Sequence, residues 1–174
     1  PDIGNELTVT VETDNPILFP SGSITNSSPT ALSGVPRTIS LNPAANLSGQ
    51  ATISVKVNDG NFTQEEKITV TVNAVNDPPE LVLLDTLKTN EDLPINLNLF
   101  ANDIDNANSS IVYTVSSVVQ GVNDTLIHAS TVGNILKLTP KANYYGIDTL
   151  TVSATDGEAS SSKTTIVQIK SIND

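Results

Sequence analysis

The sequence predicts an all-β protein made of two antiparallel β-sandwiches in tandem, joined by a short proline-containing linker. Three observations lead to this prediction. One stretch of sequence occurs twice at a fixed spacing, apolar and polar residues alternate along much of the chain, and Asp, Asn, Gly and Pro separate the alternating segments. No helical stripe longer than two turns is present.

The repeat pairs ISLNPAANLSGQATISVKVNDG (39–60) with LKLTPKANYYGIDTLTVSATDG (136–157). Matching positions lie 97 residues apart, and the match continues without a gap from residue 39 to residue 77. Both copies close on Asn-Asp, at residues 76–77 and 173–174. Similarity at a fixed period is the signature of modules in an array, so each copy should fold as a unit.

The alternating segments read as strands, each with one apolar face. Period-two alternation with β-branched residues is typical of strands that are half-buried in an antiparallel sheet. We expect about seven short strands per sandwich. The predicted inward positions are Ile53, Val55, Val57, Ile68, Val70 and Val72 in the first copy, and Leu150, Val152, Ala154, Thr165, Val167 and Ile169 in the second.

The linker begins after the first Asn-Asp, where Pro78-Pro79 follows. Proline fixes φ and cannot donate to a strand ladder, so we expect a stiff, extended joint. The predicted domains are therefore residues 1–77 and 78–174. Because the first is short for a sandwich, we expect it to lack its first strand.

Composition excludes several classes of partner. The formal net charge is −11, from 19 acidic and 8 basic residues, which repels nucleic acid and anionic membranes and attracts cations, although solubility alone would also explain it. No segment approaches the ~20 apolar residues of a membrane span, so we expect no nucleic acid and no direct membrane contact. Cysteine is absent, which excludes disulfides and thiolate metal sites. The start, PDIGNELTV, has neither an initiator Met nor a signal-peptide pattern, and we interpret the chain as a piece of a longer protein.

The second copy contains TNEDLPINLNLFANDIDNANSSIVYTV, then TPKANYYGIDTLTVSATDG, then a closing SIND, and the first contains NPILFP and PRTISLNPAANLSG. In this order the motifs resemble the cadherin-like and bacterial Ig-like tandem repeats of large bacterial surface proteins and adhesins. The resemblance covers nearly the whole chain. It implies two Ig-like (cadherin-like) domains at the cell surface or in the extracellular space.

Cadherins bind Ca²⁺ between consecutive domains, and the resemblance carries some of their acidic motifs to this chain. Asp103 and Asp105 match the DxD pair, Asp156 matches a later acid, and Asn76-Asp77 matches the core of the linker motif. The segment LTPKAN stands where cadherins have the acids of DRE, and Asn108 lies one residue closer to DxD than in cadherins. A calcium site here should therefore have fewer carboxylates than a cadherin site.

The chemistry of these residues suits Ca²⁺, which takes six to eight oxygen ligands. On extended chain Asp103 and Asp105 would point the same way and share one ion. We expect Asn76, Asp77, Asp103, Asp105 and Asp156 to converge at the joint as an inter-domain Ca²⁺ site. Turn preference explains the Asp-Gly dipeptides equally well when each is taken alone.

A second candidate metal set lies at the far end of the second copy. It consists of Glu91, Asp92, Asn173 and Asp174, with Glu91 or Asp92 in the place of the cadherin xEx acid. This set would need a following module to complete its ligand shell.

Catalysis within the chain is not expected. His128 is the single histidine, and the sequence shows no nucleophile–base pair. We therefore expect a non-enzymatic stalk or spacer stiffened by Ca²⁺, with neighbouring repeats of the same chain as its partners.

Two alternatives remain open. One is a module that binds a polysaccharide or another cell-surface protein, for which the uncharged segment 20–36 would be a recognition loop rather than a slack connection. The other is an accessory segment of a secreted enzyme.

Overall fold

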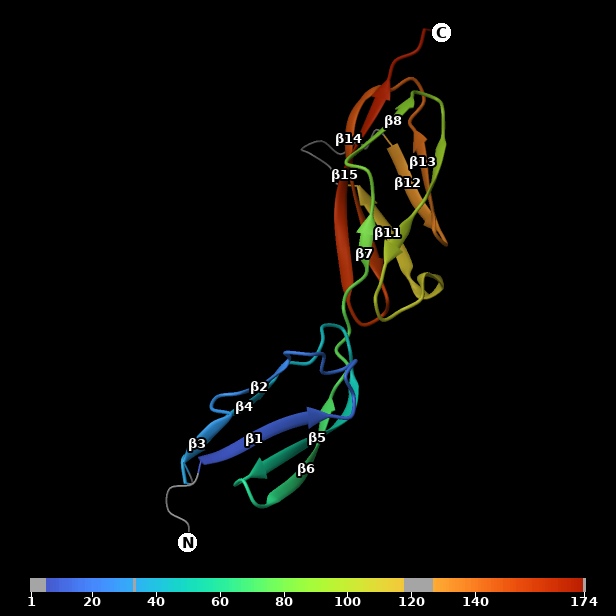
Figure 1. Cartoon of the computed structure of the whole chain (residues 1–174). Coiled ribbons are helices and arrows are strands. Elements are labelled where there is room, and N and C mark those ends of the chain that lie inside the picture. The colour runs from blue at the N-terminus through green and yellow to red at the C-terminus, as the bar shows by residue number, and fades with distance from the viewer. Residues whose placement is uncertain (1–5, 33, 118–126, 174) are drawn as a thin grey trace. The chain divides into compact units, whose positions relative to one another are not determined.

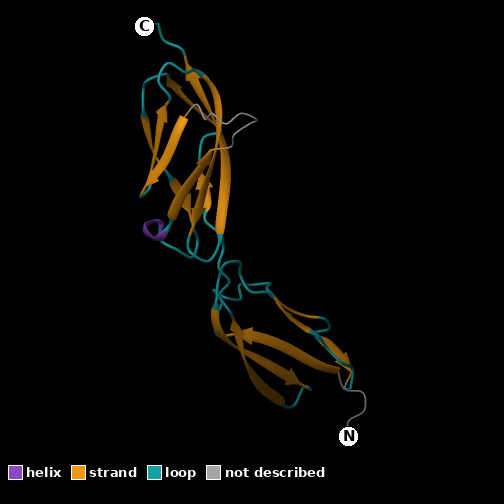
Figure 2. Ribbon diagram, turned by 180° about the vertical axis from the view of Figure 1, so that it is seen from behind, coloured by secondary structure: helices purple, strands orange, loops and turns teal. Residues whose placement is uncertain are grey.

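The computed structural model describes residues 6–32, 34–117 and 127–173 and divides into two compact units, Pro1–Val75 and Asn76–Asp174 (Figure 1). The predicted boundary lies after residue 77, so the structure assigns Asn76 and Asp77 to the second unit. The regular secondary structure of the described residues consists of strands and one short 3₁₀ turn, η1 (Asn108–Ser110), shown in purple in Figure 2. No helix in this described part is long and apolar enough to cross a membrane.

The first unit forms a four-stranded sheet in the order β3-β1-β5-β6 and a two-stranded sheet, β2-β4, with all pairings antiparallel. Its strands are β1 (Glu6–Thr13), β2 (Ile24–Asn26), β3 (Thr30–Leu32), β4 (Ile39–Leu41), β5 (Gly49–Asn58) and β6 (Thr63–Val72). Segment 20–36 is therefore not a single long loop, because it contains β2 and β3. A small core of Leu18, Phe19, Ala51 and Ile53 lies between the sheets.

The second unit has more strands and a larger core. Its sheets have the orders β11-β14-β15-β8, β12-β13-β9 and β10-β7. The strands are β7 (Glu80–Val82), β8 (Thr86–Asn90), β9 (Ile95–Asn98), β10 (Phe100–Asn102), β11 (Val112–Ser117), β12 (Ile127–Val132), β13 (Ile135–Pro140), β14 (Gly146–Thr155) and β15 (Ser160–Lys170). β8 pairs in parallel with β15, which departs from the expected antiparallel pattern. The two strands are distant in sequence, so no hairpin dictates their direction.

Backbone conformation explains why the same turn residues occur in both copies. Asn46 and Asn143, at matching positions, both adopt the left-handed region with φ of 58° and 57°. Gly60 and Gly157 also match, with φ of 96° and 104°. Asn and Gly tolerate positive φ better than other residues, so these turns require them in both copies.

The inward faces of the matching strands differ in burial. Val152, Ala154 and Val167 of the second unit are fully buried at 0% exposure. Ile68 on β6 is 54% exposed instead. The cause is coverage, because β7–β10 have no counterpart among the described residues of the first unit. β1 pairs with β5 in the first unit as β11 pairs with β14 in the second.

Candidate metal site

Three segments meet at one end of the second unit. Asn76 and Asp77 precede β7, Asp103 and Asp105 follow β10, and Asp156 follows β14. All five belong to the unit that starts at Asn76, so the linker Asn-Asp is part of this module.

Asn76 bridges two of these segments. Its Nδ2 donates to Asp156 Oδ2 at 2.8 Å, and its Oδ1 accepts from Asn106 Nδ2 at 3.2 Å. The backbone N–H of Asp77 donates to Asp105 Oδ2 at 2.7 Å. The structure therefore links all three segments through side chains predicted from the sequence, together with Asn106. Sequence reasoning missed Asn106, although it directly follows the Asp-Ile-Asp motif.

The Asp103 segment is a turn rather than extended chain. Asp103 Oδ1 accepts the backbone N–H groups of Asp105 at 2.9 Å and Asn106 at 2.7 Å. The premise that Asp103 and Asp105 lie on extended chain is therefore wrong, because the Asp103 carboxylate holds a local turn. Its other oxygen, Oδ2, is buried and has no hydrogen-bond partner.

Asp156 also holds a turn. Its Oδ1 accepts the N–H groups of Glu158 and Ala159, both at 2.7 Å. The pKa of Asp156 is lowered, chiefly by the Ala159 N–H, then by the Asn76 amide and the Glu158 N–H, because each bond favours the charged carboxylate. The amide of Asn76 ties this turn to the linker.

The first unit contains the same turn, and among the described residues no other segment donates a side-chain hydrogen bond to it as Asn76 does to Asp156. Asp59 Oδ1 accepts the N–H groups of Asn61 at 2.8 Å and Phe62 at 2.7 Å. The pKa of Asp59 is lowered, with the Phe62 N–H as the largest cause. The turn alone thus accounts for Asp-Gly in both copies, and the bond to Asn76 is the feature that distinguishes Asp156.

The family of the chain follows from a match that begins at this site. Residues 76–169, more than half of the sequence, match the family model described as "Bacterial Ig domain". The chain belongs to the bacterial Ig domain family. The match to this bacterial Ig domain starts at Asn76, the first residue of the second structural unit. No curated protein matches the chain.

Solved structures show the fold of this bacterial Ig domain protein. Drosophila N-cadherin EC1-4 has a TM-score of 0.53 at 19% identity, covering 98% of this chain and 42% of that one. Human protocadherin-24 EC1-2 has a TM-score of 0.53 at 15% identity, covering 96% and 82%. The chain also matches an endo-fucoidan hydrolase of glycoside hydrolase family 107, with a TM-score of 0.40 and 17% identity, covering 98% of this chain and 24% of that chain's length. Bacterial Ig and cadherin-like domains are typically extracellular or surface-exposed repeat modules.

The candidate site of this bacterial Ig domain offers carboxylate and amide oxygens, which are the ligands that a hard cation such as Ca²⁺ prefers. Within this set, Asp103 Oδ2 is the oxygen that is buried without a hydrogen-bond donor, so it most needs a positive partner. The described residues contain no group of three or more His, Cys, Asp or Glu side chains placed to hold a metal. Asp105 Oδ2 accepts the backbone N–H of Asp77, and Asp156 Oδ2 accepts the side-chain amide of Asn76.

Two residues of the second predicted metal set, Glu91 and Asp92, accept hydrogen bonds from backbone N–H groups of the bacterial Ig domain. Glu91 is 4% exposed, and its Oε1 accepts the Ile172 N–H at 2.9 Å. Asp92 has a positive φ of 60°, and its Oδ1 accepts the Asn143 N–H at 3.1 Å. Asn173 is exposed, and Asp174 lies outside the described residues. Glu91 and Asp92 therefore have structural roles in closing this end of the unit.

Asp148 is a buried acid that sequence reasoning missed. It is 8% exposed, its Oδ1 accepts the Thr149 N–H at 2.8 Å, and its Oδ2 is buried with no hydrogen-bond partner. The signal was available, since an acid stands at position 148 of an alternation that continues through Leu150, Val152 and Ala154.

Proposed function

We propose that the chain is a non-enzymatic structural repeat of an extracellular bacterial surface protein, a stalk or spacer whose joint is stiffened by Ca²⁺. The observation that supports this proposal is the network joining Asn76 and Asp77 to Asp105 and Asp156, with Asp103 Oδ2 buried and unpartnered beside it. Its direct partners are neighbouring repeats of the same chain.

The proposed role of the ion is electrostatic. Three carboxylates, those of Asp103, Asp105 and Asp156, lie in segments that the linker joins, and like charges brought together repel each other. Ca²⁺ would take Asp103 Oδ2 first, because that oxygen gives up no hydrogen bond. Asp105 and Asp156, with the amide oxygen of Asn76 and the carboxylate of Asp77, would supply further ligands. The linker would then be held to the second unit by the ion as well as by the three hydrogen bonds present without it.

The test is thermal unfolding of the whole chain after EDTA treatment, then with millimolar CaCl₂ or MgCl₂. All three tyrosines, Tyr113, Tyr144 and Tyr145, belong to the second unit, so tyrosine fluorescence follows that unit alone. We expect Ca²⁺, and not Mg²⁺, to raise the melting temperature, because Mg²⁺ demands near-ideal octahedral geometry and dehydrates reluctantly. Titration calorimetry should show one Ca²⁺ ion bound per chain.

Matched variants separate the ion from the turn. Asp103→Asn retains an acceptor for the two turn N–H groups but removes the charge, and it should abolish the calcium response. Asp59→Asn changes the equivalent of Asp156 in the first unit and should leave the response intact. Equal melting in all three buffers, together with no calorimetric signal, would remove Ca²⁺ from the account.

A further inference from the structure

A cavity opens inside the second unit at the point where β13 ends beside β9. Ile135 is the first residue of β13 and pairs with Asn98, and the next contact is the Leu99 N–H, which donates to the Asn134 carbonyl at 2.7 Å. Beyond this turn β10 pairs with β7 and with no other described strand. The short β12–β13 hairpin therefore stops before it can cover the rest of β10.

The cavity has a volume of about 380 Å³, which lies within the usual range of about 300–1,000 Å³ for small-ligand pockets. Three core residues, Leu99, Ile111 and Tyr113, contribute apolar surface to its lining and are at most 7% exposed. The turn η1 and the end of the β12–β13 hairpin lie side by side in both views of the chain (Figures 1 and 2). The cavity thus reaches from the core of the unit to its surface.

The outer part of the lining is polar and uncharged. Asn108, Ser109 and Asn134 line the cavity and are exposed, and no described residue forms a hydrogen bond with their side chains. The η1 turn is held by other groups, since the N–H and the hydroxyl of Ser110 both donate to the Ala107 carbonyl, at 2.9 and 2.7 Å. The amide and hydroxyl groups of these three side chains are therefore available to a ligand.

Phe100 adds an aromatic side chain to this lining and is 45% exposed. A purely apolar ligand would leave the amides of Asn108 and Asn134 without partners. A charged ligand would find no opposite charge among the described lining residues, and a net charge of −11 also repels anions. A pyranose sugar meets both requirements, because it has an apolar C–H face that packs on an aromatic ring and hydroxyls that donate to and accept from amides.

We propose that this cavity binds a neutral sugar residue of a polysaccharide. The apolar face of the sugar packs on Phe100, and its hydroxyls bond to Asn108, Ser109 and Asn134. The repeat then holds a glycan in addition to serving as a spacer. None of these residues belongs to the metal site, so each of the two proposals can fail without the other.

The probes are the neutral methyl glycosides of glucose, galactose and mannose, titrated separately into the full-length chain and followed by amide NMR in EDTA. We expect at least one of them to shift residues 99–100, 108–113 and 133–134, with a Kd of about 1 mM, the affinity that ordinary ligand efficiencies give for a molecule of this size. Glucuronic acid, which adds a carboxylate to the same ring, should bind more weakly than the glucoside.

Matched variants locate the site. Asn134→Ala removes an amide but keeps the carbonyl that holds Leu99, and it should weaken binding about threefold to tenfold. Phe100→Leu keeps an apolar side chain and removes the ring, and it should also weaken binding. Asn98→Ala changes an exposed asparagine outside the lining and should leave the Kd unchanged.

Three results would overturn the proposal. The first is the absence of shifts with every neutral glycoside at about ten times the expected Kd. The second is an equal effect of Asn98→Ala and Asn134→Ala, which would place any binding elsewhere on the chain. The third is tighter binding of glucuronic acid than of the glucoside, because the uncharged lining offers a carboxylate no partner.

Discussion

The exposure of the inner face of β6 predicts that one substitution will have unequal costs in the two repeats. Val70 and Val167 match at a separation of 97 residues, but Val167 is 0% exposed and Val70 is only half-buried. Val167→Ala removes two methyl groups, each worth about 0.8 kcal/mol in transfer free energy, and leaves a closed cavity. We expect Val167→Ala to lower the free energy of unfolding by about 2–3 kcal/mol, and Val70→Ala by roughly 1 kcal/mol.

The assay must read the two units separately. Urea unfolding followed by tyrosine fluorescence measures the second unit, since Tyr113, Tyr144 and Tyr145 all lie there. Hydrogen exchange with mass spectrometry, read on peptides from β5 and β6, measures the first. Each variant should alter only the unit in which it lies, with an unchanged slope against urea.

An equal cost at the two valines would refute this reasoning. It would mean that the inner face of β6 is as well covered in solution as that of β15. An exchange rate in β6 that depends on protein concentration would then identify a second copy as the cover. A smaller cost at Val70, with no concentration dependence, is the result that the exposed inner face of β6 requires.

Three further predictions concern polar groups of the second unit. Thr165→Val keeps the shape but leaves the Leu84 carbonyl without its donor, so it should cost about 1–3 kcal/mol in urea unfolding, and a neutral effect would show that water replaces the hydroxyl. The pKa of Asp156 is lowered on folding, so the charged Asp156 carboxylate stabilises the folded state above the unfolded pKa of about 3.9, and this stabilisation is lost as pH falls through the folded pKa. Asp156→Asn should therefore reduce the loss of stability at acid pH. An unchanged dependence of stability on pH would contradict the role given to Asp156. Asp148→Ala introduces the residue that the first repeat has at Ala51 and removes a buried, unpartnered oxygen, Oδ2, so the urea midpoint should stay equal or rise. A clear fall would reveal a partner for Oδ2 or a stabilising bond from the Thr149 N–H to Oδ1.

The fold was predictable because burial follows the alternation of the strands. Leu150, Val152 and Ala154 were assigned to one inward face, and all three are at 0% exposure. The sequence did not predict which inward faces are covered by other strands. The same alternation places Ile68 inward, but nothing in the sequence of β6 shows whether another strand packs against it. Tertiary context decides that, and the parallel pairing of β8 with β15 is a long-range contact.

The sequence selected residues whose segments the structure connects, but it did not predict their geometry. Asp103 and Asp156 were selected by motif, and the structure connects their segments through Asn76 and Asn106. The extended-chain assumption failed at Asp103 because a short carboxylate satisfies nearby backbone N–H groups more readily than it projects outward. Residue spacing alone therefore does not reveal which oxygens remain available for a ligand.

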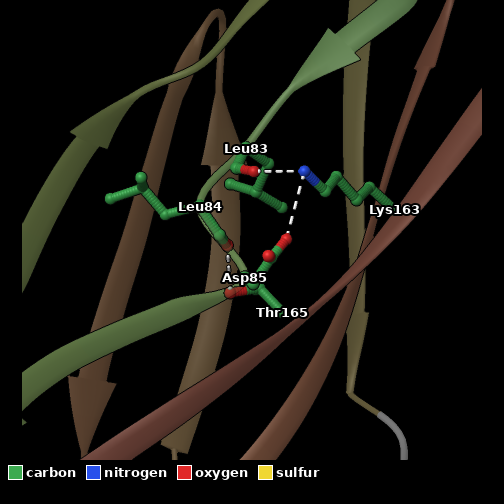
Figure 3. A network of polar contacts seen from close by, with 5 residues as sticks. All are labelled: Leu83, Leu84, Asp85, Lys163 and Thr165. Carbon is green, nitrogen blue, oxygen red and sulfur yellow. Dashed lines mark hydrogen bonds and ion pairs between the residues drawn. The ribbon is translucent and has the colours of Figure 1, made fainter.

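Comparison of the two repeats separates backbone requirements from functional ones. Asn46 and Asn143 share a left-handed φ, and Asp59 and Asp156 hold the same turn, so their recurrence reflects the needs of the chain itself. Positions where the copies differ are more informative. Glu66 in place of Lys163 reverses a charge at a point where the two hairpins pair in the same register. A difference of that kind is not needed to form the strand, and Lys163 instead binds the segment before β8 through Leu83 and Asp85 (Figure 3).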